Sequence, residues 1–333
     1  MSEPVFETLR VAGEPMTLRD LGPADAPALL ELHQAVFGSA VDAAWYRWKY
    51  GEGGGEGVGL WWQGALIAHC GGLPRRFWHA GQRTRDLQIG DVMVSPPWRG
   101  VLTRHGPFHH VSRAFYRSRL GTGRFHAGYG FPGDRHLQLA VRTGLLRAGG
   151  VVSGLRWDGP AALPWGWRAQ PLAPTLPGFD AMANRAWEAM LAEGGRLSLG
   201  WRDAAWLRWR YLQRPGPAPL FLALRRPWLR QVLGLAVLAP QPGEPGTLQW
   251  LDWVGPPRAL ELACAACRQE AARQGARHLT AWASPAVAGR LAGSGLAASS
   301  EVARIGMPRA ALLSADEVAE LDWWFMGGDT DFL

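Results

Sequence analysis

Lysine is almost absent from this chain of 333 residues, because Lys49 is its only lysine. The formal net charge of +7 is therefore carried by arginine. The planar guanidinium of arginine binds phosphates and carboxylates through paired hydrogen bonds, so the composition is compatible with a phosphate-rich cofactor, nucleic acid or an acidic carrier protein. Charge alone selects none of these ligands, and we expect most of the arginines on a solvated face.

Cysteine and long apolar runs are also scarce. Three cysteines are too few for a disulfide framework and fit a reducing compartment. Cys264 and Cys267 have the CxxC spacing, but no second pair completes a zinc site, and we expect two small buried side chains. The longest apolar stretch, Val232 to Ala239, is far shorter than the roughly 20 residues of a membrane helix. The first residues, Met-Ser-Glu-Pro, lack the pattern of a leader. These features predict a cytoplasmic protein without a membrane span.

The chain does contain an internal repeat. Asp42–Tyr50 reads DAAWYRWKY, and Asp203–Tyr211, 161 positions later, reads DAAWLRWRY. A second pair, Leu87–Asp91 and Leu248–Asp252, is separated by the same 161 positions. This period is far longer than the roughly 20 to 50 residues of a solenoid repeat, so we expect each copy to have its own hydrophobic core. The predicted domains are 1–150, then a proline- and tryptophan-rich segment 151–190 that crosses the surface, then 191–333 with an aromatic tail.

Strand and helix patterns alternate in both copies. In the first copy we expect strands at 16–21, 58–62, 65–71, 82–94 and 123–131. We expect helices with N-caps at Asp25 and Asp42, a helix that begins at Pro107, and a helix capped by Asp134 that runs to Arg142. In the second copy we expect strands at 220–224, 231–239, 247–254 and 278–283, and helices at 259–274 and 285–292. The predicted fold class is α/β (α+β), with a mixed central β-sheet flanked by helices in each copy.

Two abundant residue types carry no separate prediction of a site. The 19 tryptophans include the pairs Trp45 with Trp48 and Trp206 with Trp209. Their i, i+3 spacing places each pair on one helix face, as packing anchors more than as stacking platforms for bases. The histidines are scattered along the chain, and we expect no metal site.

One strand, loop and helix unit has the features of an anion-binding site. The strand Asp91–Val94 is followed by Ser-Pro-Pro, by a loop that contains Arg99, Gly100, Arg104, His105 and Gly106, and by a helix that begins at Pro107 and includes Phe108. A helix N-terminus carries about half a positive charge, so a pyrophosphate can bind there while the arginines supply further donors. An ordinary basic loop with turn glycines is the alternative interpretation.

Taken together, the run Val92–Val94, Pro97, Arg99–Gly100, the later Tyr129-Gly-Phe-Pro132 and the helix stop Thr143–Leu145 resemble the GCN5-related N-acetyltransferase (GNAT) superfamily. The resemblance covers residues 16–148 and extends more faintly to 195–310 through the repeat. It implies two tandem GNAT-like domains and an acetyl-CoA or other acyl-CoA donor whose pyrophosphate binds the loop after the fourth strand. The resemblance assigns donor binding to Val92, Met93, Val94, Arg99, Gly100, Arg104, His105, Gly106 and Phe108. Counted from Arg99, the two glycine positions of the family loop hold Leu102 and Arg104 in this chain.

The second copy lacks the equivalent loop, since Trp253-Val-Gly-Pro-Pro-Arg leads directly into a helix. The donor is therefore expected in the first copy only. In the family the acceptor amine attacks the thioester directly while strand N–H groups polarise its carbonyl. Asp91 is the first candidate for the base that removes the ammonium proton, and Tyr129 and His136 are candidates for proton transfer to the thiolate. Asp252 is the counterpart of Asp91 in the copy that lacks the anion-binding loop, which favours a shared structural role for both carboxylates.

The predicted function is transfer of an acetyl or longer acyl group from a CoA or carrier-protein thioester to a small-molecule amine. A monomer with internal pseudo-symmetry is expected, and nucleic acid is not an expected partner. Two alternatives remain open at this point. One is a tandem aminoacyl ligase resembling the peptidoglycan-bridge enzymes, and the other is a duplicated binding module without catalysis.

Overall fold

The computed structural model describes residues 6–101, 104–226, 228, 232–310 and 321–330. The chain forms two compact units. Unit 1 consists of Met1–Arg76, Thr84–Gly150 and Arg304–Glu320, and unit 2 of Phe77–Arg83, Val151–Ala303 and Leu321–Leu333. Among the described residues, no helix combines the length and the hydropathy needed to cross a membrane.

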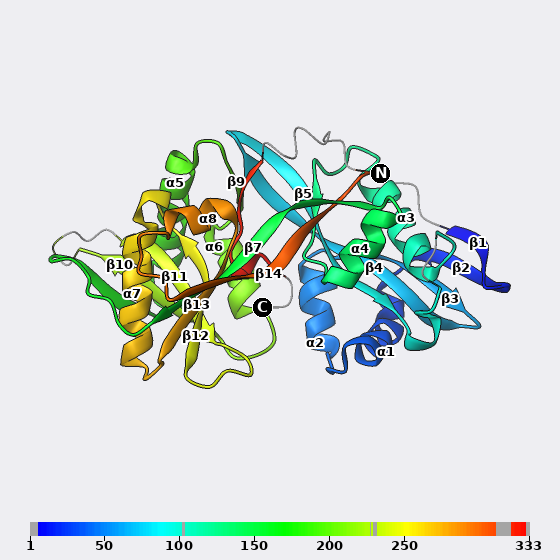
Figure 1. Ribbon diagram of the computed structural model, residues 1–333, viewed down its shortest axis with the longest axis horizontal. Helices are drawn as coiled ribbons and strands as arrows, with labels where there is room; N and C mark the ends of the chain where they lie inside the picture. Colours follow the sequence, from blue (N-terminus) through cyan, green and yellow to red (C-terminus); the bar gives the residue numbers. More distant parts are fainter. Residues whose placement is uncertain (1–5, 102–103, 227, 229–231, 311–320, 331–333) are drawn as a thin grey trace. The chain divides into compact units, whose positions relative to one another are not determined.

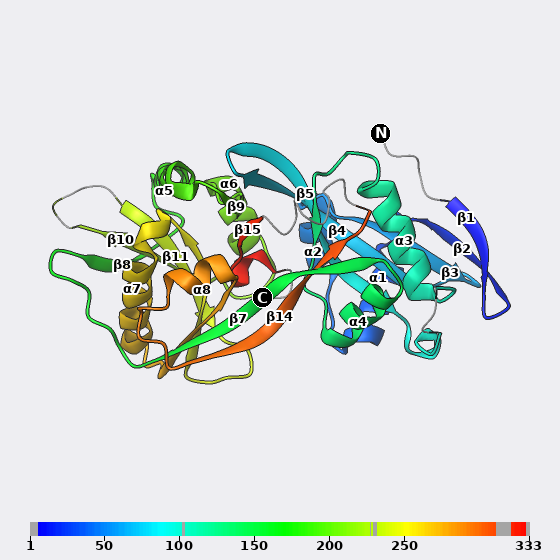
Figure 2. The same cartoon turned by 45° about the horizontal axis from the view of Figure 1, so that its top comes forward.

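Unit 1 is built on a mixed sheet whose strands follow the order β1-β2-β3-β4-β5-β6. Its strands are β1 (Phe6–Val11), β2 (Glu14–Asp20), β3 (Glu56–Trp62), β6 (Gly128–Tyr129) and most of β4 (Ala65–His79) and β5 (Gln82–Val94). The end of β4 and the start of β5 belong to the segment Phe77–Arg83 of unit 2, and β7 (Leu146–Asp158) begins in unit 1. Its helices are α1 (Ala26–Phe37), α2 (Ala43–Tyr46), α3 (Pro107–Arg119) and α4 (Asp134–Arg142). Neighbouring strands from β1 to β4 are antiparallel, whereas β5 and β6 are parallel. Helix α3 packs against β3, as Figure 2 shows.

Unit 2 repeats this plan. Its main sheet has the order β14-β7-β13-β12-β11-β10-β8, and β12 and β13 form the parallel pair. Its strands are β8 (Arg168–Leu172), β9 (Leu197–Gly200), β10 (Leu220–Arg225), β11 (Val232–Pro240), β12 (Thr247–Val254), β13 (His278–Ala283) and β15 (Asp322–Trp324), with part of β14 (Ala298–Pro308). Its helices are α5 (Phe179–Gly194), α6 (Ala204–Leu207), α7 (Leu260–Arg273) and α8 (Pro285–Arg290). All eight residues of β12 are buried. Because successive side chains point to opposite faces, both faces of the sheet are covered at β12.

The repeated phrase folds in the same way in both units. The Asp42 carboxylate accepts a hydrogen bond from the Trp45 N–H at 2.9 Å, and Asp203 does the same for Trp206 at 2.9 Å. These N-caps start α2 and α6, and each helix continues into a π-helical turn, at Arg47–Glu52 and Arg208–Leu212. The N-cap predicted at Asp42 is confirmed.

The segment 151–190 differs from its prediction as a surface crossing. It contains most of β7, all of β8 and the first part of α5, and Leu155 and Trp157 of β7 are buried in the core of unit 2. Prolines obscured these elements in the sequence. Pro171 lies in β8, which ends the strand order of its sheet, and proline is tolerated in an edge strand because its missing N–H can face away from the ladder.

The strand predicted at 123–131 is much shorter in the structure. Only Gly128–Tyr129 forms a strand, and Gly123, where the predicted strand begins, adopts a left-handed φ of 73° that does not fit an extended chain. Met326 lies in the aromatic tail and is buried with Trp323, Trp324 and Phe325, so the tail docks onto unit 2 through β15 and β9 as expected.

Candidate functional site

The predicted base Asp91 lies near the end of β5 in a strained backbone conformation. Its φ is 50°, in the left-handed region that residues with a side chain rarely occupy. The His69 ring on β4 contacts this point, because its Nδ1 lies 2.7 Å from the Asp91 carbonyl oxygen. A carbonyl only accepts, so Nδ1 carries the proton and donates it. His69 therefore supports the bend in β5.

The Asp91 carboxylate is held by two groups from the repeated phrase. Lys49 Nζ donates to it at 2.8 Å and the Tyr50 hydroxyl at 2.6 Å. Burial by itself raises the pKa of the Asp91 carboxyl, but the charge of Lys49 and the hydrogen bonds from Lys49 and Tyr50 outweigh burial and hold this pKa below its ordinary value. Such a carboxylate is a weak proton acceptor, so the geometry favours a positioning role.

Unit 2 repeats this contact. The Tyr211 hydroxyl donates to the Asp252 carboxylate at 3.1 Å, and both residues lie 161 positions after Tyr50 and Asp91. The two sequence echoes are therefore contacting parts of one structural motif. In unit 2 the cation is Arg202, whose Nε lies 2.8 Å from Asp252 and which also pairs with Asp329 of the tail.

The tail of unit 2 occupies the end of its parallel strand pair. Strands β12 and β13 pair from Thr247 with His278 to Trp250 with Ala281, and beyond that point Met326 bridges Ala283. Gly328 follows so closely that a Cβ there would lie 2.9 Å from Asp252 Oδ2 and would overlap the Tyr211 hydroxyl.

Backbone contacts fix this part of the tail. Arg210 donates to the Gly328 carbonyl at 3.0 Å and to the Thr330 carbonyl at 2.7 Å. The tail is thus an integral part of unit 2, seated beside Asp252.

The parallel pair of unit 1 is shorter. β6 pairs with β5 only at Leu87 with Gly128 and at Gln88 with Tyr129, while β5 continues to Val94. Among the described residues, the Asp91 carboxylate accepts from Lys49 and Tyr50 of the π-helical turn Arg47–Glu52 and not from a tail segment. The predicted donor-binding strand residues lie on this last part of β5, where Met93 is buried and Val92 and Val94 are half-buried.

The predicted loop leads from β5 to the start of α3. Arg99, Gly100, Arg104 and His105 are exposed, and Gly106 is buried as the N-cap of α3, followed by Pro107 as expected. Arg99 Nε donates to the Val94 carbonyl at 3.0 Å, which ties the loop to the end of β5. Leu102, at one of the family's glycine positions, lies outside the described residues.

The helix start is electropositive. Burial and, to a smaller extent, the positive charges of His110, Arg113, Arg104 and His105 together lower the pKa of His109 to about 4. A positive potential at a helix N-terminus is suited to an anion such as a pyrophosphate.

The remaining two predicted catalytic residues are also in unit 1. Tyr129 is fully buried on β6, and its hydroxyl lies 3.5 Å from Gln88 Oε1. His136 on α4 packs edge-to-face on Phe108 of α3 with ring centroids 4.8 Å apart. Burial lowers the pKa of His136 to about 4, and its Nε2 has no hydrogen-bond partner among the described residues. Phe108 and His136 are thus brought together, as are Tyr129 and the β5 strand.

Sequence reasoning missed His69 and the role of Lys49. Lys49 is 3% exposed and His69 is fully buried. The signal for Lys49 was present, because the only lysine of the chain stands in the repeated phrase directly before Tyr50. No comparable signal marked His69, whose contact with Asp91 depends on strand pairing.

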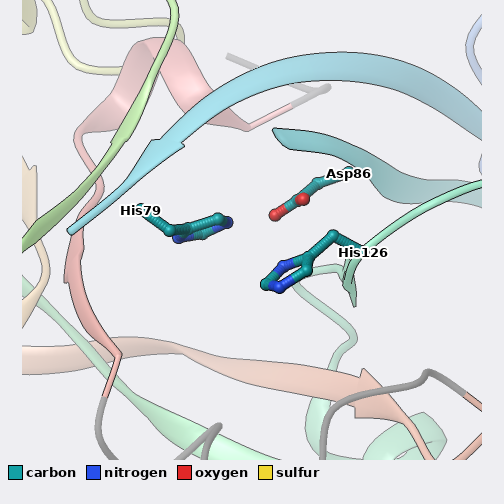
Figure 3. A group of neighbouring side chains, drawn as sticks. All are labelled: His79, Asp86 and His126. Carbon is teal, nitrogen blue, oxygen red and sulfur yellow. The ribbon is translucent and has the colours of Figure 1, made fainter. Parts of the chain in front are cut away.

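The CxxC pair and the histidines, from which the sequence predicts no metal site, can be located in the structure. Cys264 and Cys267 are buried in α7, and burial raises the pKa of Cys264 to about 12. Figure 3 shows Asp86 and His126, both in unit 1, whose ligand atoms lie within 4.8 Å of each other. His79, drawn with them, belongs to the segment Phe77–Arg83 of unit 2, and we assign no metal to this group.

Several solved structures resemble this fold. A tandem GNAT protein from the clavulanic acid biosynthesis pathway superposes with a TM-score of 0.58 at 13% identity, over 90% of this chain and 100% of that protein. A conserved protein of unknown function from Enterococcus faecalis, described as a probable N-acyltransferase, gives 0.64 at 12% identity over 88% of this chain and 72% of its own. A GCN5-related N-acetyltransferase from Kribbella flavida gives 0.61 at 16% identity over 88% and 70%.

By sequence the comparison is negative, since no family model and no curated protein matches the chain. Identities of 12–16% establish the fold and not the reaction. The chain therefore has the tandem GNAT fold, with a mixed sheet flanked by helices in each of its two copies.

Proposed function

We propose that this protein is an acyltransferase with a single donor site in unit 1. The donor is an acetyl-CoA, a longer acyl-CoA or an acylated carrier protein, and the acceptor is a small-molecule amine. The observation that carries the proposal is the difference between the two parallel strand pairs. In unit 2 the tail around Met326–Thr330 lies at the end of the pair, whereas in unit 1 β5 runs on past β6 toward an electropositive helix start.

The residues of unit 1 suit an acyl-CoA in three respects. Arg99 and Arg104 are exposed, so Arg104 and the N–H groups of Arg99 that do not bind backbone carbonyls can donate to pyrophosphate oxygens. The N–H groups in the first turn of α3, beginning after Pro107, add the positive end of the helix dipole. Gly100 and Gly106 allow the backbone to approach the ligand closely, and Phe108 offers an apolar contact. His105 adds a further donor, and Val92, Met93 and Val94 would run beside the pantetheine arm.

The proposed reaction needs little covalent chemistry from the protein. The amine attacks the thioester carbonyl carbon, the carbon–sulfur bond breaks, and the thiolate leaves as the amide forms. The acceptor nitrogen loses one proton, and the thiolate gains one. Positioning of the two reactants and N–H donors of β5 facing the carbonyl oxygen would supply most of the rate enhancement.

We assign a role to each of the three acid–base candidates. Asp91 is proposed as a positioning residue, because its carboxylate already accepts from Lys49 and Tyr50. Tyr129 is proposed as the proton donor to the thiolate from its place beside β5. His136 is proposed as the alternative group for proton transfer to the thiolate, because its Nε2 has no hydrogen-bond partner among the described residues.

Calorimetric titration of acetyl-CoA and longer acyl-CoAs tests the donor site. Replacing Arg99 by Gln and Arg104 by Ala should weaken binding by about tenfold or more, since each charge-assisted hydrogen bond contributes about 1.5–3 kcal/mol. Arg196→Ala, which removes an exposed arginine of unit 2, serves as the control and should bind normally. Equal affinity of the double variant and the control would reject the site.

Salt dependence separates this function from the aminoacyl-tRNA alternative. Binding of a coenzyme should weaken only mildly as salt rises, whereas tRNA binding falls steeply because many phosphates release counterions. Tight, steeply salt-dependent tRNA binding without acyl-CoA binding would favour the ligase.

A further inference from the structure

A cavity in unit 2 is left without a role by the proposed donor site. Its volume is about 670 Å³, within the range of roughly 300–1,000 Å³ usual for small-molecule sites. It is lined by α5, by Trp167 before β8, by Arg226 after β10, by the start of β11, by the turn before α7 and by the first turn of α7. Figure 1 labels α5, β10, β11 and α7. All of the lining residues belong to unit 2.

Most of the residues that line this cavity are apolar. Helix α5 contributes Met182, Ala189 and Ala192, spaced so that they share one helix face with Arg185. The opposite wall contains Val232 and Leu233 of β11, Ala259 before α7 and Leu262 within it. Small alanine side chains beside branched ones leave room for an unbranched aliphatic chain.

Positive charge surrounds this apolar interior. Arg185 and Arg226 line the cavity, and both make no hydrogen bond or ion pair with other described residues. Arg226 stacks over Trp167, with its guanidinium carbon 4.8 Å from the ring centroid. The third arginine, Arg258, is neutralised by Glu193. The cavity thus retains two uncompensated cations, which favours an anionic head group.

An aromatic rim adjoins the same segments. Trp165 and Trp228 are 92% and 59% exposed, and their ring centroids lie 5.4 Å apart. Trp165 lies two residues before Trp167 in the sequence, and Trp228 lies two residues after Arg226. Exposed tryptophans in contact with each other are unusual on a free surface and are typical of a site where an apolar ligand enters.

We propose that this cavity binds an amphiphilic anion, an unbranched aliphatic chain with a carboxylate or phosphate head. The chain lies against Ala189, Ala192 and Leu262, and the head is bound by Arg185 and Arg226. This site is independent of the proposed donor site, so either proposal can fail without the other.

Calorimetry with simple probes tests the site. Octanoate and octyl phosphate should both bind, and their relative affinities identify the preferred head group. Octyltrimethylammonium has the same chain and the opposite charge, and it should bind at least tenfold more weakly. Equal affinity for the cationic probe would overturn the assignment of the two arginines.

Two variants locate the ligand. Arg185→Gln with Arg226→Gln should weaken binding of octanoate about tenfold or more, whereas Arg196→Gln, at an exposed position outside the cavity lining, should have no effect. Ala189→Trp fills the aliphatic part and should abolish binding of both anionic probes. Normal binding by a folded Ala189→Trp variant, checked by circular dichroism, would show that the ligand does not occupy this cavity.

Discussion

His69 is predicted to make unit 1 sensitive to mild acid. Burial lowers the pKa of His69 to about 4, below the ordinary value of 6.5. The folded state therefore binds fewer protons than the unfolded state between these two pH values. The contribution of the neutral His69 ring to the free energy of unfolding is fully present above about pH 6.5. It is lost as the pH falls toward 4, because the unfolded state takes up the proton first. A shift of this size corresponds to about 3 kcal/mol, at 1.36 kcal/mol for each pH unit.

The variant His69→Asn isolates this contribution. Asparagine places an amide nitrogen near the position of Nδ1, so it can keep donating to the Asp91 carbonyl, but it does not titrate. Urea unfolding measured at steps from pH 7 to 4, with separate transitions fitted for the two units, gives stability against pH. We expect the slope for unit 1 to fall by up to about 1.4 kcal/mol per pH unit in the variant.

The control is His105→Gln, which removes an exposed imidazole from the loop before α3. Its slope should follow that of the wild type. The Asp91 carboxyl does not confuse the result, because its folded pKa is lowered from 3.8 and its contribution disappears only at more acidic pH. Identical slopes for the wild type and a folded His69→Asn variant would refute the reasoning.

Two further predictions concern buried contacts. Lys49→Met leaves the Asp91 carboxylate buried without its cation, so it should destabilise unit 1 by about 3–5 kcal/mol in a thermal unfolding assay. Adding Asp91→Asn should recover part of this loss. A double variant as unstable as Lys49→Met alone would contradict the prediction. Gly328→Ala should destabilise unit 2 by about 1–3 kcal/mol through overlap with Tyr211, while Gly289→Ala, which meets open space, should be neutral or stabilising in the same assay.

Elements bounded by clear stop signals could be predicted from the sequence with high accuracy. Strand β5 ends before two prolines, and both its limits, Gln82 and Val94, match the prediction. Helix α4 ends at Arg142 as predicted, followed by Gly144 with a left-handed φ of 78°, whereas its N-cap is Gly133 and not the predicted Asp134. Local chemistry is sufficient in these places, because a breaker and a periodic pattern coincide.

Elements without such signals could not be predicted. β14 begins with five exposed residues, so it lacks the alternation that marks a half-buried strand. The contact between Lys49 and Asp91 joins residues 42 positions apart, and it forms only when the π-helical turn Arg47–Glu52 lies beside β5 in the folded protein. The candidate loop could be located because strand, prolines, glycines and arginines follow one another directly, while the hydrogen bonds that position Asp91 were hidden.

The two copies keep the same tyrosine–aspartate contact but stabilise it by different means. In unit 1 the cation is Lys49, which lies one residue before Tyr50 and needs no other segment. In unit 2 Arg202 bridges Asp252 to Asp329, so the same motif also anchors the tail. Burial and the charge of Asp329 raise the pKa of Asp252, although Arg202 opposes them. The buried aspartate is therefore a structural feature common to both copies. The copies differ in the cation that pairs with it, because Arg202 of unit 2 also binds the tail. Among the described residues a tail segment lies beside Asp252 and none lies beside Asp91, and this difference supports the proposal that the donor binds to unit 1.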